Sequence, residues 1–421
     1  MPLVNMKDLL IHAYRNGYAV GAFDLVSLDF LQAIMSAAES ARAPVILSIS
    51  ESSFAHAELD LIMPAVEAAA LRAKVPVAIH LYQGANLDSA VRAIRLGCNG
   101  VMVDASREPL FENINRTRAV VDMAHACGVA VEGELGNAHG MGGENDEHNS
   151  GPVSYSYTTV AEAKGYVERT GVDFLSVSVG TMNGRMKDKP KLEWSRLKEI
   201  NAALGIPLAI HGGSGLSDDQ YRKLITLGVA KINYNTVLSD VAGERIRSNA
   251  KQDRHGGYAA LLSGIREAIQ AEIEHCLRIW GSAGRAAEVS AQCRPWLNVE
   301  QVVVYNAPKL DEDQLRAMML EGQRQLIAIP GVRAVQVGSV VDKSDRYRHC
   351  WLIRLASAAA IANYNKHPIH VAFAARQFHP AAADRIAADY CVAGFDHAAA
   401  LLPLSAAPVA GGMSASQTSR L

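Results

Sequence analysis

Polar side chains recur in the first part of the sequence at the points where short apolar runs end. The positions are Asp24, Glu51, Tyr82, Gln83, Asp104, Glu134, Asn183, His211 and Asn235. Carboxylate, imidazole and phenol groups are among those that enzymes use as general acids and bases. A polar residue can also simply mark the end of a strand, so any one of these positions alone would mean little. Their recurrence after every apolar run predicts a single active face to which all the runs contribute.

Eight apolar, β-branched runs must position these side chains, and stretches with helical periodicity follow them. We predict strands at residues 19–23, 44–50, 76–81, 100–104, 130–136, 174–180, 207–211 and 230–234. Residues 28–41, 61–71, 116–127 and 159–170 are examples of the amphipathic helices between them. Strands that alternate with helices predict a parallel sheet, and eight such units predict a closed (β/α)8 TIM barrel. The C-terminal ends of the strands form the active face of such a barrel.

The rest of the chain has a different order of elements. A long helix is predicted at 257–279, and the periodicity lapses around 286–295. Strands at 302–305, 334–341, 349–356 and 386–391 then combine with helices at 311–327 and 358–365. The order βαββαβ is that of a ferredoxin-like α+β domain. We therefore predict a barrel at 1–286, a linker at 287–300, an α+β domain at 301–393 and a flexible tail at 394–421.

Length and composition exclude several classes of protein. The 421 residues exceed the roughly 100–200 of an average domain, in agreement with two domains. A net charge of −2 gives no reason to expect a nucleic-acid partner. The cysteines form no CxxC pair, which argues against a disulfide scaffold and a thiolate zinc site. Because the N-terminus lacks an apolar signal segment and no run is long enough to span a membrane, we expect a cytoplasmic protein without membrane contact.

A series of short motifs runs through the barrel part in a fixed order. They are GAF at 21–23, PVAIHL at 76–81, VMVDAS at 101–106, VEGELG at 131–136, TGVDFL at 170–175, HGGSGL at 211–216, KIN at 231–233 and WGSAG at 280–284. Together they closely resemble the class II ketose-bisphosphate (fructose/tagatose-bisphosphate) aldolases, from about residue 4 to 286. The resemblance implies retro-aldol cleavage of a phosphorylated ketose. It also implies a zinc ion that polarises the ketone and no organic cofactor.

The resemblance places three zinc histidines and a proton-transferring aspartate in motifs that have changed here. The family's HLDHG is His80-Leu81-Tyr82-Gln83-Gly84, so Tyr82 replaces the aspartate and Gln83 a histidine. The family's second histidine position is Asn183, and only His211 remains. Glu134 could add a ligand. One imidazole and two amide oxygens make a poor zinc site, because zinc prefers imidazole, thiolate or carboxylate.

The phosphate-binding motifs of the family are present. The carrying residues are Gly212, Gly213 and Ser214 in the first loop, Asn233, Asn235 and Thr236 in the second, and Lys187. Consecutive backbone N–H groups in such loops cradle phosphate oxygens. The alternative is that these glycines serve only the turns of the barrel.

Further proton-transfer candidates lie in and near the loop after the fifth strand. Glu144 and Asp146 occupy the region where family members carry an acidic residue that closes over the substrate, and His139 could act as a base or a replacement ligand. A lone loop histidine is often merely solvated. Tyr82 could be a general acid if its pKa falls, or it could pack over the altered metal site.

The C-terminal part resembles the Dabb family of stress-responsive dimeric α/β barrel domains, over about 302–392. The resemblance rests on Ile329-Pro330-Gly331-Val332, the stretch from Tyr364 to Phe373, and Asp389-Tyr390. Members of this family pair two sheets between subunits, so a homo-oligomer, dimer or tetramer, is expected. His367 and His370 could line a cleft, or they could have a helix-capping or structural role.

The leading hypothesis is carbon–carbon lyase chemistry on a small phosphorylated sugar or triose phosphate in an altered site. One alternative is a pseudoaldolase that binds sugar phosphates without cleaving them. Another is a metal-independent isomerase or eliminase that uses Tyr82 and His139 as acid and base.

Overall fold

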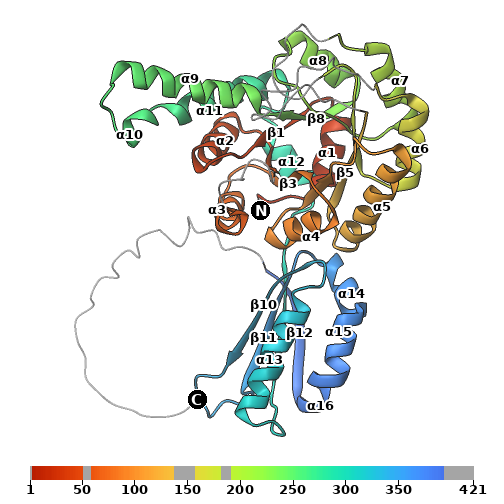
Figure 1. Cartoon of the computed structure of the whole chain (residues 1–421), viewed down its shortest axis with the longest axis vertical. Helices are drawn as coiled ribbons and strands as arrows, with labels where there is room; N and C mark the ends of the chain where they lie inside the picture. Colours follow the sequence, from red (N-terminus) through yellow and green to blue (C-terminus); the bar gives the residue numbers. More distant parts are fainter. Residues whose placement is uncertain (1, 51–57, 137–156, 182–190, 393–421) are drawn as a thin grey trace, which may run out of the picture.

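The computed structural model describes residues 2–50, 58–136, 157–181 and 191–392. It has a barrel and a smaller α+β domain (Figure 1). The barrel strands are β1 (Val20–Asp24), β2 (Val45–Ser50), β3 (Val77–Gly84), β4 (Gly100–Val103), β5 (Ala130–Leu135), β6 (Phe174–Val177), β7 (Leu208–Ile210) and β8 (Val229–Tyr234). Each pairs in parallel with the next, and β1 pairs with β8 to close the ring. The predicted TIM barrel is therefore confirmed.

Helices surround this ring and cover its apolar strands. They are α1 (Met6–Arg15), α2 (Leu28–Ala41), α3 (Leu59–Leu71), α4 (Leu87–Leu96), α5 (Leu110–Ala126), α6 (Val160–Thr170), α7 (Trp194–Leu204), α8 (Asp218–Thr226), α9 (Thr236–Gln252), α10 (Tyr258–Leu261), α11 (Ile265–Ile279) and α12 (Ala286–Gln292). Several begin at side-chain caps that the sequence provides, such as the capping boxes of Thr159 with Glu162 and Ser217 with Gln220. Because helices cover the outside and side chains fill the inside, the strands are almost entirely buried.

Strand β3 is irregular at its end, where the family motif has changed. Its register with β4 shifts between Leu81 and Gly84, and Gln83 adopts a positive φ of 51°. A Cβ atom at Gly84 would lie 2.7 Å from Leu81 Cδ2 and 2.9 Å from the Met102 carbonyl oxygen, so only glycine fits there. This bulge fixes the path of the backbone that carries Tyr82 and Gln83.

Two regions differ from the elements that the sequence predicts. The single helix expected at 257–279 is divided into α10 and α11, because Gly264 between them has a φ of +74°. Residues 286–292 form the helix α12, although the sequence predicts no regular element there. Val289 of this helix is buried in the apolar cluster that includes Leu9 of α1. The helical period was obscured in α12 because the helix has only seven residues.

The C-terminal domain has a four-stranded antiparallel sheet in the order β10-β11-β9-β12. Its elements are β9 (Val299–Tyr305), α13 (Glu312–Leu326), β10 (Val332–Ser339), β11 (His349–Leu355), α14 (Ala359–Lys366), α15 (Pro368–Phe373), the π-helical η2 (Ala374–Phe378), α16 (His379–Ala381) and β12 (Arg385–Cys391). This is the predicted βαββαβ order, with the second helical region broken into short pieces. Its apolar core, which includes Tyr305, Trp351 and Phe373, is separate from that of the barrel.

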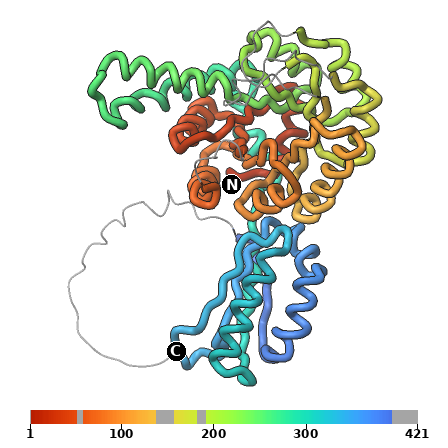
Figure 2. The backbone as a smooth tube through the Cα atoms, in the orientation of Figure 1, coloured from red at the N-terminus to blue at the C-terminus, as the bar shows by residue number. Residues whose placement is uncertain are grey.

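The C-terminal domain adjoins the barrel on one side (Figure 2), where it contacts α4 and α5. The Arg333 guanidinium forms a bidentate ion pair with Glu67, at 2.7 and 2.8 Å, and only 7% of the Arg333 side chain is exposed. Arg95 donates to the Ile327 carbonyl oxygen at 2.8 Å, and Ser357 donates to that of Cys127 at 2.7 Å. Arg95 and Cys127 lie at the ends of α4 and α5, just before the next strands begin. These contacts join the C-terminal domain to the ends of α4 and α5 that lead into β4 and β5. None of the described helices is both long and apolar enough to cross a membrane.

Candidate functional site

The polar centre of the barrel is built from alternating residues on neighbouring strands. Side chains two apart on a strand point to the same side, so Glu132 and Glu134 of β5 both face inward. Lys231 and Asn233 of β8 follow the same rule, and His211 comes directly after β7. These five side chains are all buried, at 5% exposure or less.

His211 is held between two carboxylates. Its Nε2 lies 2.7 Å from Glu132 Oε1, and its Nδ1 lies 3.2 Å from Glu134 Oε1. Burial alone would lower the pKa of His211, but the charges and hydrogen bonds of Glu134 and Glu132 raise it to about 9. Because both ring nitrogens donate to carboxylates, the imidazolium form satisfies the site best. An imidazolium has no lone pair to offer a metal ion.

A second layer of charge lies below this imidazole. Glu132 Oε2 lies 2.8 Å from Lys231 Nζ and 3.5 Å from His80 Nε2, and Lys231 also donates to Asn233 Oδ1 at 2.5 Å. Burial opposes ionisation of Glu132, but Lys231 and His211 lower its pKa below the usual range for glutamate. His80 is buried beside Lys231, and both effects lower its pKa to about 3, so His80 is neutral. Glu132 is therefore the central anion of the cluster.

Tyr82 covers the imidazole of His211. The two rings meet edge to face, with centroids 4.9 Å apart and planes at 86°, and Lys231 Nζ lies 5.9 Å from the centre of the phenol ring. Burial raises the pKa of Tyr82 well above its usual value, and the carboxylates of Glu134 and Asp24 raise it further. To act as the general acid that the sequence suggests, Tyr82 would need a lowered pKa, and the pKa of Tyr82 is raised instead. Tyr82 remains a neutral phenol that can donate a hydrogen bond.

The glycine loop after β7 has the conformation that its sequence suggests. Gly212 and Gly215 adopt positive φ angles of 63° and 88°. A Cβ atom at Gly213 would lie 3.1 Å from Ile232 Cγ2, and the Gly213 carbonyl oxygen accepts a hydrogen bond from Tyr221 Oη at 2.5 Å. The glycines therefore serve both the tight turn and the packing of the loop on β8.

The second loop leads into the long helix α9. Asn235 is the N-cap of α9, a helix of 17 residues that begins at Thr236, and its side chain makes no capping hydrogen bond. The Asn235 carboxamide oxygen instead accepts from Ser239 Oγ at 3.2 Å. The first N–H groups of α9 thus donate no hydrogen bond to this side chain, which is the arrangement in which helix ends bind anions.

Several predicted site residues lie outside the described part of the chain. They are Glu51, His139, Glu144, Asp146, Asn183 and Lys187. Of the other candidates, Gln83 is partly exposed at the end of β3, Ser214 is buried in the glycine loop, and Asp24 and Asp104 lie at the ends of β1 and β4. The structure brings Tyr82, Glu134 and His211 together.

Glu132, Lys231 and His80 belong to the same cluster, although the sequence did not single them out as site residues. Their spacing could have identified them, because each lies two residues before a candidate on the same strand: Glu134, Asn233 and Tyr82.

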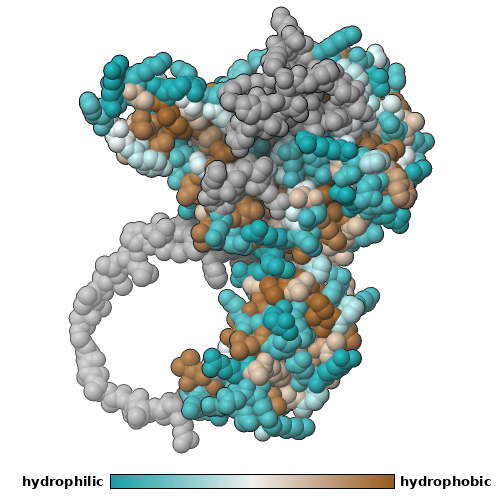
Figure 3. Space-filling view, viewed as in Figure 1, coloured by the Kyte–Doolittle hydropathy of each residue, from teal (hydrophilic) through white to brown (hydrophobic). Residues whose placement is uncertain are grey.

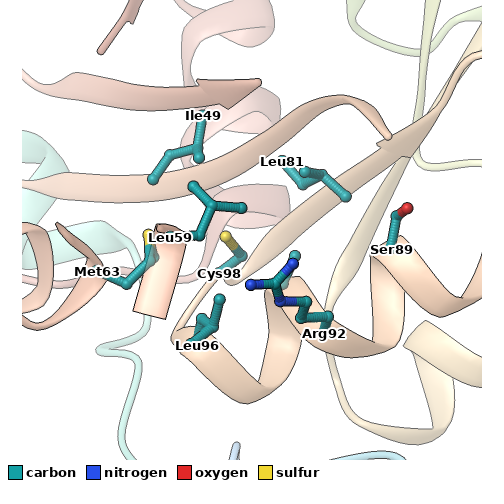
Figure 4. A pocket seen from close by; sticks show the side chains of 9 residues that line it. Ile49, Leu59, Met63, Leu81, Ser89, Arg92, Leu96 and Cys98 are labelled. Carbon is teal, nitrogen blue, oxygen red and sulfur yellow. The ribbon is translucent and has the colours of Figure 1, made fainter. Parts of the chain in front are cut away.

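A cavity of about 10 Å³ elsewhere, between β2, β3, α3 and α4, has room for about one water molecule (Figure 4). It is lined mainly by apolar side chains such as Leu81 and Met63, and it is too small for a sugar phosphate.

The described residues around His211 do not form a donor set that suits zinc. Among the described residues, no three histidine, cysteine, aspartate or glutamate side chains are arranged to hold a metal ion. The remaining family ligand, His211, has both nitrogens directed at carboxylates, and the Gln83 position supplies an amide. Zinc sites are normally built from imidazole, thiolate and carboxylate groups.

Residues 4–285 match the family described as fructose-bisphosphate aldolase class-II, and residues 299–392 match the stress responsive A/B barrel domain. The chain belongs to the class II fructose-bisphosphate aldolase family. A fructose-bisphosphate aldolase from Staphylococcus epidermidis is 38% identical over 290 residues, covering 68% of this chain and 100% of that protein. A probable fructose-bisphosphate aldolase from Bacillus subtilis is 39% identical over 291 residues, with the same coverage.

The solved structure of the YdjI aldolase from Escherichia coli K12 shares 30% identity and superimposes with a TM-score of 0.60. The match covers 68% of this chain and 99% of the YdjI chain. All three relatives align with about two thirds of this chain. The resemblances to both families that the sequence motifs indicate are confirmed.

Proposed function

We propose that the barrel acts on a small phosphorylated ketose by carbon–carbon lyase chemistry, in a site that lacks the family's three-histidine zinc centre. The observation that carries the proposal is the clamping of His211 between Glu132 and Glu134 beneath Tyr82. The glycine loop after β7 and the start of α9 support the assignment to phosphorylated ligands. Family membership supports the lyase class.

Retro-aldol cleavage needs a donor to the substrate ketone and a base for the hydroxyl two carbons away. In this site the neutral phenol of Tyr82 can donate a hydrogen bond, and the positive charge of His211 lies directly below it. Glu134 Oε2 is buried and has no hydrogen-bond partner among the described residues, so it can accept a proton from a bound hydroxyl. We assign the ketone to Tyr82 and the hydroxyl to Glu134. Glu144 and His139 are further acid–base candidates of the loop.

The second candidate is a protein that binds sugar phosphates without cleaving them. Each charged side chain of the Glu132 cluster has an oppositely charged partner, so these residues could stabilise the barrel without taking part in catalysis. Purified protein treated with a chelator should be incubated with fructose 1,6-bisphosphate and tagatose 1,6-bisphosphate, and aldehyde products should be trapped with hydrazine. Aldehyde formation that survives chelation supports the proposed lyase. Binding without turnover identifies the pseudoaldolase, and turnover without aldehyde identifies an isomerase or eliminase.

We predict that dihydroxyacetone phosphate stabilises the protein and that Asn235→Asp abolishes the effect. Ligand that binds only the folded state raises the melting temperature. Aspartate is as good an N-cap as asparagine, so the variant should fold normally, but its charge would repel phosphate from α9. Asn5→Asp, at the cap of α1, is the matched control and should respond like wild type. Equal responses of Asn235→Asp and wild type in differential scanning fluorimetry would contradict the assignment of α9.

We also propose a homo-oligomer, dimer or tetramer, that uses the outer face of the C-terminal sheet. The face of this sheet that points away from the helices carries Leu352, Ile386 and Tyr390, which are 36%, 53% and 54% exposed. Figure 3 shows hydrophobic residues at the surface of this domain. Such a face is expected to be covered in solution.

The variant Ile386→Lys should therefore reduce the molar mass in light scattering, because a buried lysine opposes association. The control is Val341→Lys, at a position that is 99% exposed outside the sheet. A wild-type protein that is monomeric at micromolar concentration would overturn the proposal, and so would an Ile386→Lys variant with unchanged mass.

A further inference from the structure

The C-terminal domain contains a cavity that the barrel chemistry does not use. Its volume is about 200 Å³, and it lies between the helix-facing side of β9, β11 and β12 and the helices α13 to α16. An apolar cavity of about 150 Å³ is enough to hold benzene. This cavity can therefore accept a ligand of about one ring with a small substituent.

The inner wall of the cavity is aromatic and firmly held. Trp351 packs edge to face on Phe373 and Phe378, with ring centroids 5.8 and 6.2 Å apart, and all three side chains are buried. Gly322 of α13 lies against Trp351 and Phe373 so closely that a Cβ atom there would collide with both rings. Because the packing fixes these rings, the apolar part of the site is formed before a ligand binds.

The outer rim of the cavity is basic. Arg385, His370 and His379 line it, and Ala387 on β12 leaves space beside them. One Arg385 nitrogen donates to the Ala382 carbonyl oxygen at 2.9 Å, and no carboxylate in the described chain lies within ion-pair distance of this guanidinium. Asp389, the next acid on the same face of β12, is held by Gln301 Nε2 at 3.0 Å. Arg385 thus gives the rim a cationic donor that is available for an anion.

We propose that this cavity binds a small monocarboxylate with a compact apolar body, the carboxylate at Arg385 and the body against Trp351, Phe373 and Phe378. Arginine suits a carboxylate because its planar fork can donate two hydrogen bonds. The site is independent of the proposed barrel function. It lies in the C-terminal domain, which contacts α3, α4 and α5 of the barrel and does not contain His211.

The test compares benzoate with benzamide, its neutral counterpart of nearly equal shape, on the full-length protein. Binding is measured by calorimetry and by the change in tryptophan fluorescence. Benzoate should bind saturably and benzamide roughly tenfold or more weaker, because one charge-assisted hydrogen bond is lost. Arg385→Gln should weaken benzoate by a similar factor, and Arg385→Lys should restore part of the affinity.

A second variant tests the cavity itself. Ala387→Leu should fill the space and weaken benzoate binding, whereas Ala362→Leu, at an exposed position of α14 that does not line the cavity, should bind like wild type. The proposal is overturned if benzoate does not bind at millimolar concentration, or if benzamide binds equally well. It is also overturned if the two leucine variants behave alike while both retain the wild-type melting temperature.

Discussion

The triple variant Tyr82→Asp, Gln83→His, Asn183→His should hold one zinc ion per chain, whereas the wild-type protein should contain far less. The variant restores the two imidazoles and the aspartate of the family motif. It also removes the phenol ring that packs 4.9 Å from His211. Zinc can then compete with Glu132 and Glu134 for a nitrogen of His211, because three imidazoles bind zinc far better than one imidazole and two amides.

Elemental analysis after dialysis against zinc decides the result. Wild-type fructose 1,6-bisphosphate cleavage should be at least roughly a hundredfold below that of a zinc-bearing family member, because a general base alone contributes about that much. The single change Gln83→His is the control and should leave the zinc content low. Tightly bound zinc in the wild-type protein would contradict the account and would point to Glu134 and His139 as a rebuilt site. A triple variant that stays free of zinc would show that His211 does not leave its carboxylate partners.

Glu132→Gln should destabilise the barrel severely. The substitution keeps the shape of the side chain but leaves Lys231 and His211 without their shared carboxylate, and all three side chains are essentially unexposed. Loss of one partner from a buried ion pair typically costs about 3–5 kcal/mol of unfolding free energy. Urea unfolding should be followed by circular dichroism, with the barrel transition treated separately from that of the C-terminal domain.

The matched control for this substitution is Glu321→Gln, which removes a partly exposed carboxylate from its pair with Arg324 and should change the stability little. A loss below about 1 kcal/mol in Glu132→Gln would mean that the cluster is not the network of charges described above. It would also remove the reason for an imidazolium at His211.

The free energy of unfolding should also depend on pH through the proton of His211. The pKa of His211 is raised to about 9 in the folded protein, so the stability that its proton provides is complete below the usual histidine range. This stability is lost as the pH rises toward 9. Wild-type unfolding free energy should therefore fall between neutral pH and pH 9 more steeply than that of a His211→Gln variant. Parallel curves would contradict the assignment of the charge to His211.

The sequence predicted the strands well for a physical reason. A parallel barrel strand is buried on both sides, so it appears in the sequence as an apolar run. Residues 45–50, which form β2 and are all buried, are an example. The break at Gly264 was missed because a single glycine within a helical pattern does not reveal a φ of +74°.

The arrangement of the site was harder to predict. The clamp on His211 joins β5 to the end of β7, and the sequence does not show which side chains of strands that are not neighbours meet inside the barrel. The same holds for the electrostatic environment of Tyr82, because its pKa is raised first by burial and then by the carboxylates of Glu134 and Asp24 on other strands. The sequence could therefore identify Tyr82 as a replacement but not the direction in which its pKa moves.

The most direct test of the central claim is a crystal grown with both zinc and dihydroxyacetone phosphate, measured at the zinc absorption edge. Density for the phosphate should lie at Gly212–Gly215 and at the start of α9. No anomalous peak should appear at His211, whose nitrogens should remain on Glu132 and Glu134. An anomalous peak bonded to a His211 nitrogen that has turned away from Glu132 or Glu134 would contradict the claim that this barrel works without the family's zinc centre.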